Sequence, residues 1–188
     1  MSTERSGPAA PVARLARGLH TVLVFVNSWV ERVFLTIATL LFAIFIFSII
    51  YQVFARSIMS WSVRWTDEIA LMCFIWSIFL GAAVALRRGM HYVIDVLPAG
   101  MVTPTNVLRL FGTLACIPLI YVMIYYGQIF ADLGWRQRSV AMQWPLFYIR
   151  VSMPIAGAAM ALFLIEVIIE DVHRLLTGRP APVQMEDL

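Results

Sequence analysis

The chain has 188 residues, of which 61% are hydrophobic and 13% charged, and its mean hydropathy is +0.84. A water-soluble domain of this size needs charged residues over its whole surface, and this composition lies outside the range of such domains. The formal charge of +3 rests on Arg alone, since no Lys occurs, and the Arg residues are dispersed between apolar runs. Nucleic-acid binding is excluded, because it needs basic residues clustered on one face. The composition predicts an all-α integral membrane protein.

The N-terminal region divides into two parts. Residues 1–11 are expected to be disordered, and residues 12–32 are expected to form an amphipathic helix that lies in the cytoplasmic interface of the membrane. Arg14 and Arg17 would then contact lipid headgroups, and the apolar stripe would face acyl chains or a partner subunit. The stripe recurs at three- and four-residue steps: Val12, Leu15, Leu19, Val22, Val26 and Val30.

Four apolar runs follow, each close to the roughly 20 residues that a helix needs to cross the hydrocarbon core. They predict transmembrane helices over about 33–54, 67–87, 108–131 and 147–169, within a membrane domain of residues 33–170. For the last run we expect Arg150 and Glu166 to lie at opposite interfaces and to reach outward. Residues 171–188 are expected to form a cytoplasmic tail.

The distribution of Arg predicts the orientation. Nine Arg residues precede the first span, connect the second to the third, or follow the fourth, and five lie in the other two loops. The positive-inside rule therefore places both termini in the cytoplasm. Four of the six Trp residues fall in the opposite loops, as expected of an aromatic belt or a docking surface: Trp61, Trp65, Trp135 and Trp144.

The spans offer no residues for catalysis or for a solute pathway. No charged side chain lies in the middle of a span, and the polar residues found there can bond back to their own helix or across to a neighbouring one: Thr36, Thr39, Ser48, Ser77 and Thr113. No His lies within a span to ligate haem, and the two Cys residues have no ligand spacing. We therefore expect no catalytic residue, no substrate-binding residue, no metal and no cofactor.

Small residues in the second and fourth spans predict close helix packing. Gly81 lies among three Ala residues in the second span, and Gly157 lies among four in the fourth. These faces could meet each other inside the bundle, or one of them could receive a partner.

One stretch resembles a known family. From Gln52 to Pro98 the chain reads QVFARSIMSWSVRWTDEIALMCFIWSIFLGAAVALRRGMHYVIDVLP, which is similar to the signature region of the small membrane subunit (DctQ-type small permease) of TRAP transporters, the tripartite ATP-independent periplasmic systems. The residues that carry the likeness are Gln52, Val53, Phe54, Arg56, Trp65, Thr66, Asp67, Glu68, Leu80, Gly81, Ala82, Ala83, Arg87, Gly89, His91, Asp95 and Leu97. Met90 departs from the family, which often has a polar or small residue there.

The resemblance implies a role and partners. In this family a large membrane subunit binds the substrate and sodium, a periplasmic binding protein delivers an organic acid, and the small subunit supports the moving part as a scaffold. The implied location is a bacterial inner membrane. Because the chain stops at Leu188, we expect the large subunit to be a separate polypeptide. The residues alone leave two alternatives, an independent four-helix transporter or exporter and a non-transporting membrane assembly factor.

The motif residues have structural and functional interpretations. Thr66 is placed to cap the second helix, with Asp67 and Glu68 in its first turn, where carboxylates suit the positive end of the helix dipole. Glu68 is also expected to pair with Arg56, with Arg64 or with a partner residue, and Trp65 to pack at the level of the headgroups.

On the opposite side, Arg87 and Arg88 end the second helix and are expected to contact lipid phosphate. His91 and Asp95 are four residues apart and would share one face of a short helix. Two such residues are too few for a metal site, so a structural or partner contact is the interpretation.

Overall fold

The computed structural model describes residues 9–58, 64–89 and 102–177. In these ranges the chain forms α1 (Ala9–Ile58), α2 (Arg64–Arg87), α3 (Val102–Leu133), the 3-10 turn η2 (Gly134–Arg136), α4 (Phe147–Arg150) and α5 (Ser152–Thr177). Four of the helical segments are long and apolar enough to cross a membrane, over Val22–Ile58, Arg64–Arg87, Leu110–Arg136 and Phe147–Val172. In the described residues the predicted all-α fold, with four helices long and apolar enough to span a membrane, is confirmed.

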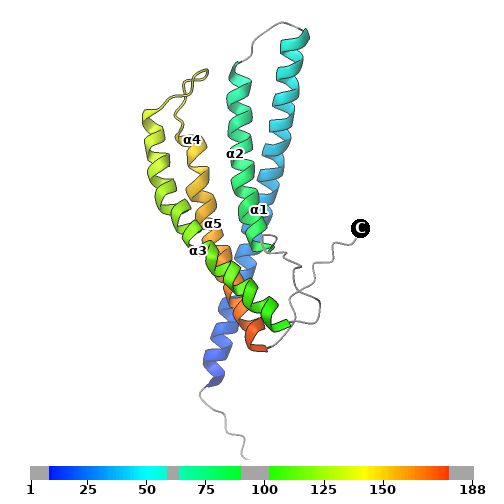
Figure 1. Ribbon diagram of the computed structural model, residues 1–188, viewed down its shortest axis with the longest axis vertical. Helices are drawn as coiled ribbons and strands as arrows, with labels where there is room; N and C mark the ends of the chain where they lie inside the picture. The colour runs from blue at the N-terminus through cyan, green and yellow to red at the C-terminus, as the bar shows by residue number, and fades with distance from the viewer. Residues whose placement is uncertain (1–8, 59–63, 90–101, 178–188) are drawn as a thin grey trace, which may run out of the picture.

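The helices are arranged as two pairs (Figure 1). α1 packs along α2, α3 packs along α5, and the two pairs meet mainly through α2 and α5. In Figure 1 the pairs lie together at one end of the molecule and separate towards the other. α2 and α5 are therefore the inner helices, and α1 and α3 form the two flanks.

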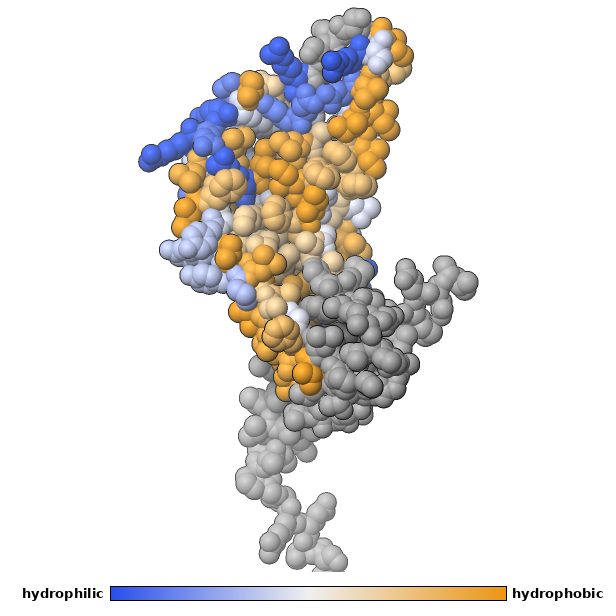
Figure 2. Space-filling view, in the orientation of Figure 1, coloured by the Kyte–Doolittle hydropathy of each residue, from blue (hydrophilic) through white to orange (hydrophobic). Residues whose placement is uncertain are grey.

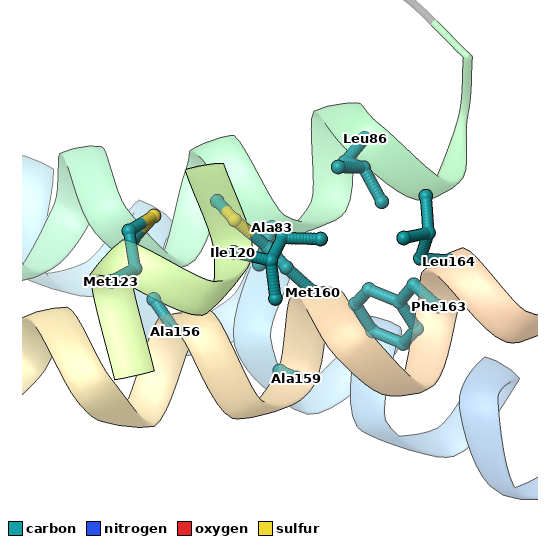
Figure 3. Packing of buried hydrophobic residues seen from close by; sticks show 9 residues of the cluster. All are labelled: Ala83, Leu86, Ile120, Met123, Ala156, Ala159, Met160, Phe163 and Leu164. Carbon is teal, nitrogen blue, oxygen red and sulfur yellow. The ribbon is translucent and has the colours of Figure 1, made fainter. Parts of the chain in front are cut away.

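The core lies where α2, α3 and α5 meet (Figure 3). Ala83 of α2 and Ala156 of α5 are fully buried there, so small residues of both helices lie in the core. The larger side chains fill the space between them, and Phe163 is the largest buried one. The cluster consists of Ala83, Leu86, Ile120, Met123, Ala156, Ala159, Met160, Phe163 and Leu164.

α1 is longer than a bilayer is thick. Its 50 residues correspond to about 75 Å at 1.5 Å per residue, against roughly 30 Å of hydrocarbon. The sequence predicted a boundary between residues 32 and 33, whereas the structure has one continuous helix across it, which already includes residues 9–11. The interfacial position of residues 12–32 remains a prediction, and the side chains of Arg14 and Arg17 lie outside the described part.

The described part of this segment, from residue 22, does not bury the apolar stripe that the sequence predicts. Val22 and Val26 of the predicted stripe are exposed, whereas Asn27 is buried and Val30 packs partly against the core. The polar side of the helix thus faces the protein, because it has polar partners on α2 and α5.

Proline shapes α3 and the start of α5. Pro118 lies inside α3, where it removes one backbone hydrogen bond, and Figure 1 shows α3 changing direction along its length. Pro154 lies in the first turn of α5, where its missing N–H costs nothing within the helix. The short α4 precedes it, and Val151 separates the two helices.

The outer surface of the bundle is apolar. Large hydrophobic side chains are exposed along both flanking helices, and the space-filling view shows orange atoms over most of the visible helices (Figure 2). Hydrophilic atoms gather at the end that carries the loop between α3 and α4. This distribution suits a protein whose middle is surrounded by lipid or by another membrane subunit.

Candidate functional site

At one end of α2 the structure brings together a buried network of charged and polar side chains. The guanidinium of Arg87 donates to both carboxylate oxygens of Glu166 on α5, over 2.9 Å from Nη2 and 3.1 Å from Nε. It also donates to Glu31 on α1, and its Nη2 lies 3.0 Å from the Ser28 hydroxyl. Only 11% of the Arg87 side chain is exposed. One side chain therefore connects three helices.

Two neighbours complete the network. Asn27 of α1 is buried and donates from Nδ2 to Glu166 Oε2 over 2.6 Å and to the Leu162 carbonyl over 3.3 Å. Arg88 is more exposed, and its Nε donates to Glu31 Oε1 over 2.7 Å. We call these residues the charged network: Asn27, Glu31, Arg87, Arg88 and Glu166.

The charged network balances its own charge. Two guanidinium groups meet two carboxylates, which matters because an unpaired charge in a low-dielectric region is very costly, whereas a paired and hydrogen-bonded one is tolerated. A cleft of about 260 Å³ lies beside it, lined in part by Glu166 and Glu170. The network ties α1, α2 and α5 together at the level where the hydrocarbon-length part of α2 ends.

This site differs from the sequence-based expectations in two places. Glu166 was expected at an interface, reaching outward, but it is buried and accepts hydrogen bonds from α1 and α2. Arg87 was expected to contact lipid phosphate, but its guanidinium is directed at protein carboxylates. Both differences arise because α2 and α5 bring Arg87 and Glu166 together, and Glu31 and Asn27 on the extended α1 add further partners for them.

The sequence does contain a signal for Asn27 and Glu31 of the charged network. Asn27 and Glu31 are four residues apart, so they share one helical face, and Glu31 was the only acidic residue next to the first span. An apolar helix with an amide and a carboxylate on one face predicts a polar partner elsewhere in the bundle.

At the other end of the bundle, Glu68 holds a loop in place. Residues 137–146 form a short hairpin between η2 and α4, closed by backbone hydrogen bonds from Ser139 to Trp144 and from Leu146 to Gln137. The Glu68 carboxylate accepts from the Ser139 hydroxyl over 2.7 Å and from the backbone N–H groups of Ala141 and Met142 over 2.6 and 3.0 Å. Glu68 thereby connects α2 to the far helix pair where the pairs are most separated.

The predicted partners of Glu68 are therefore replaced. Among the described residues no ion pair joins Glu68 to Arg56 or Arg64, which are both exposed, and the hairpin supplies neutral donors instead. Thr66 is not the helix cap, because α2 begins two residues earlier at Arg64, and Thr66 is buried within the first turn.

The first turn of α2 also contacts the end of α1. The Gln52 side-chain amide donates to Asp67, and the ring of Trp65 lies 6.3 Å from the ring of Tyr51, centroid to centroid. Gln52, Trp65 and Asp67 are among the residues that carry the resemblance to the family, and the structure places them together where the end of α1 meets the start of α2.

The remaining predicted residues are dispersed or lie outside the described ranges. Within residues 9–58, 64–89 and 102–177 Gly81 mediates no packing, because a Cβ placed on it would have no neighbouring atom of these residues within 4 Å. Close packing instead occurs at Gly157, where a Cβ would lie 3.0 Å from Ile124 Cγ1. His91 and Asp95 fall in residues 90–101, outside the described part of the chain.

The arrangement holds helices together and offers little chemistry beyond that. In residues 9–58, 64–89 and 102–177 no group of three His, Cys, Asp or Glu side chains is placed to hold a metal ion. The buried carboxylates of the charged network are engaged by donors from other helices. Together with the four apolar spans, these features define a multi-pass membrane protein whose polar groups stabilise the bundle.

The comparison with protein families identifies the group. The family model described as "Tripartite ATP-independent periplasmic transporters, DctQ component" matches residues 45–174. The match covers well over half of the chain, so the chain belongs to this family of transporter components, as the motif stretch predicted. No curated protein matches the chain.

Proposed function

We propose that this chain is the small scaffold subunit of a TRAP transporter. It pairs with a separate large membrane subunit, and the pair takes up an organic acid that a periplasmic binding protein delivers, driven by sodium. Family membership supports the transporter assignment, and the family works in general with a large subunit and a binding protein. The chain itself carries no catalytic, metal-binding or substrate-binding role in this proposal.

The packed interior is the observation that carries the scaffold role. Where the helices meet, the core is filled by aliphatic, Met and Phe side chains. The buried Glu166 is paired with Arg87, and the buried Asp171 carboxylate accepts from the Thr113 hydroxyl over 2.8 Å. A solute pathway needs polar groups that replace the hydration of the solute at membrane depth. A bundle packed in this way suits a stationary support for a neighbour that carries the solute.

We further propose a bacterial inner membrane location with both termini in the cytoplasm. The excess of Arg in the loops on the charged-network side supports this orientation. In that orientation the hairpin of residues 137–146 faces the periplasm, together with Arg56, Trp65, Asp67 and Glu68, where the binding protein would dock. His91 and Asp95 would contact the partner on the cytoplasmic side, and Arg14, Arg17 and Arg88 would contact lipid headgroups.

Reconstitution tests the proposal. Proteoliposomes are prepared with this chain alone, with the large subunit alone, and with both, and uptake of a panel of radiolabelled carboxylates is measured with the binding protein and an inward sodium gradient. Uptake is expected only with both membrane subunits, the binding protein and sodium. Sodium-independent uptake by this chain alone would establish the independent-transporter alternative. Full uptake by the large subunit without this chain would favour the assembly-factor alternative.

A further inference from the structure

α3 carries polar side chains on the face that points away from its own bundle. Tyr121, Tyr125, Gln128 and Asp132 follow one another at steps of four, three and four residues, so they lie along one side of the helix. All four are exposed, whereas Met123, Gly127 and Ala131 on the opposite side are buried. We call the exposed set the polar stripe of α3. In Figure 2 paler, more hydrophilic atoms interrupt the orange surface on the flank that α3 forms.

The two tyrosines of the polar stripe lie near mid-membrane. The apolar segment of α3 runs from Leu110 to Arg136, and Tyr121 lies 11 residues from one end of it while Tyr125 lies 11 residues from the other. At 1.5 Å per residue each tyrosine is about 17 Å from the nearer end. Such a depth is unusual for tyrosine, which is enriched at the two interfaces.

The hydroxyl groups of these tyrosines have no hydrogen-bond partner among the residues that the structure describes. The rings of Tyr121 and Tyr125 stack with 5.7 Å between centroids, and the side chains are 59% and 52% exposed. Side chains on a helix point towards its N-terminus. The side chains of Tyr121 and Tyr125 therefore point away from the membrane interface beside the hairpin of residues 137–146 and into the hydrocarbon. A hydroxyl in hydrocarbon without a partner is unfavourable, so lipid alone does not suit this face.

The other flank shows the contrast. The outward side of α1 carries Leu40, Phe47 and Ile50, which have no polar atoms to satisfy. Its two threonines bond to their own helix, with Thr36 Oγ1 2.8 Å from the Arg32 carbonyl and Thr39 Oγ1 2.8 Å from the Leu35 carbonyl. Between residues 33 and 50 the outer face of α1 is thus compatible with lipid, and the outer face of α3 around Tyr121 and Tyr125 is not.

We propose that the polar stripe of α3 is the surface on which the large TRAP subunit docks, through a transmembrane helix that carries Ser, Thr, Asn or Gln. This inference rests on the proposed function, because it takes the large subunit as the partner. Hydrogen bonds from such side chains satisfy Tyr121, Tyr125 and Gln128 at membrane depth. Gln128 Nε2 already donates to Asp132 Oδ1 over 3.3 Å, which leaves the Gln128 carbonyl to accept from the partner.

A variant that removes only two hydroxyl groups tests the docking surface. This double variant, Tyr121→Phe/Tyr125→Phe, keeps the rings and their stacking. A separate variant, Gln128→Leu, removes the amide. Because each interhelical hydrogen bond in a membrane contributes modestly, the double variant should weaken binding of the large subunit about tenfold, measured by titration of labelled subunits in detergent. The melting temperature of the isolated Tyr121→Phe/Tyr125→Phe chain should stay unchanged or rise, since neither hydroxyl has a hydrogen-bond partner among the described residues. Phe47→Leu on α1, at a side chain that is 70% exposed, should leave binding unchanged.

Photo-crosslinking locates the contact directly. With p-benzoyl-L-phenylalanine at Tyr125 the assembled complex should crosslink to the large subunit, and with the same probe at Phe47 it should crosslink to lipid. Failure of the wild-type chain to bind the large subunit would overturn both the proposed function and the docking surface. Wild-type affinity of the double variant, or crosslinks from Tyr125 only to lipid or to a second copy, would overturn the docking surface and leave the proposed function standing.

Discussion

Arg87 and Glu166 form an ion pair between α2 and α5, with 2.9 Å from Nη2 to Oε1 and with 11% and 7% of their side chains exposed. The pair lies directly beside the apolar core, and the Arg87 guanidinium also lies 5.7 Å from the centre of the Phe163 ring. Because α2 and α5 are the inner helices of the two pairs, this contact joins the halves of the bundle next to Leu86 and Phe163 of the core.

Removing one partner of this pair should destabilise the bundle strongly. In Glu166→Ala the guanidinium of Arg87 loses two hydrogen bonds and Asn27 loses its carboxylate acceptor, so the buried Arg87 charge keeps one carboxylate partner, Glu31. Breaking a buried pair in this way costs about 3–5 kcal/mol of the free energy of unfolding. Thermal unfolding of the purified chain in detergent, followed by circular dichroism, measures the loss.

Two variants serve as controls for that prediction. Glu166→Gln keeps the shape and one acceptor oxygen, so it should lose less stability than Glu166→Ala. Arg88→Ala removes a guanidinium that is 46% exposed, and we expect a loss of at most about 1 kcal/mol. Equal melting temperatures for Glu166→Ala and Arg88→Ala would contradict the central role of Glu166.

Asn27→Asp should be more harmful than Asn27→Ala. The new carboxylate would lie against Glu166 Oε2, which is 2.6 Å from the Asn27 amide, so a hydrogen bond becomes a like-charge contact. Lowering the pH should restore part of the stability of Asn27→Asp, because protonating one of the two carboxyl groups supplies a donor again. Asn27→Ala should show no such recovery. Melting temperatures of both variants at neutral and acidic pH decide the point.

The sequence predicts the spans well and the polar contacts poorly. Periodicity and run length located the apolar helices, because a segment such as 110–131 must be continuously apolar to cross lipid. The family stretch was recognised from residues such as Trp65 and Gly89, which lie next to the helix ends. The partners of Glu68 could not be predicted in this way, because its hydrogen-bond donors lie more than 70 residues away in a loop with no sequence signal of its own.

The charged network shows the same difference. Arg87 at the end of an apolar helix is consistent with a lipid contact as long as no carboxylate is known to be near it. The structure brings Glu31 and Glu166 there, because α1 extends past the end of α2 and α5 passes beside it. The sequence also does not show which small residues lie in helix contacts. Among the described residues, Gly157 packs closely against α3, whereas Gly81 has no contact.

Glu68→Ala should release the hairpin of residues 137–146 without unfolding the helices. The hairpin loses one hydroxyl and two backbone N–H contacts to α2, while its own backbone hydrogen bonds and the stacking of Trp135 on Phe147, 4.3 Å between centroids, remain. Hydrogen exchange should therefore become faster at the amides of Ala141 and Met142 and stay unchanged in α3. Asp67→Ala, which removes only the contact with Gln52, is the matched control and should leave the hairpin amides protected.

Gly134 is in close contact with backbone atoms and Gly81 is not, so substitution by alanine should lower stability at Gly134 alone. A Cβ on Gly134 would lie 2.5 Å from the backbone N of Phe147, 2.7 Å from its Cα and 2.9 Å from the carbonyl carbon of Leu146. These are backbone atoms that cannot rotate away, so Gly134→Ala must displace η2 from α4, at a cost of about 1–3 kcal/mol or more.

Gly81→Ala places the same methyl group in open space within α2, where alanine favours the helix by about 1 kcal/mol relative to glycine. The isolated Gly81→Ala chain should therefore melt at the wild-type temperature or above it, whereas Gly134→Ala should melt well below it. Both are single-methyl changes measured in the same detergent, so a general effect of added volume would lower both melting temperatures together. A loss of stability in Gly81→Ala alone would mean that α2 has a neighbour at this position within its own chain.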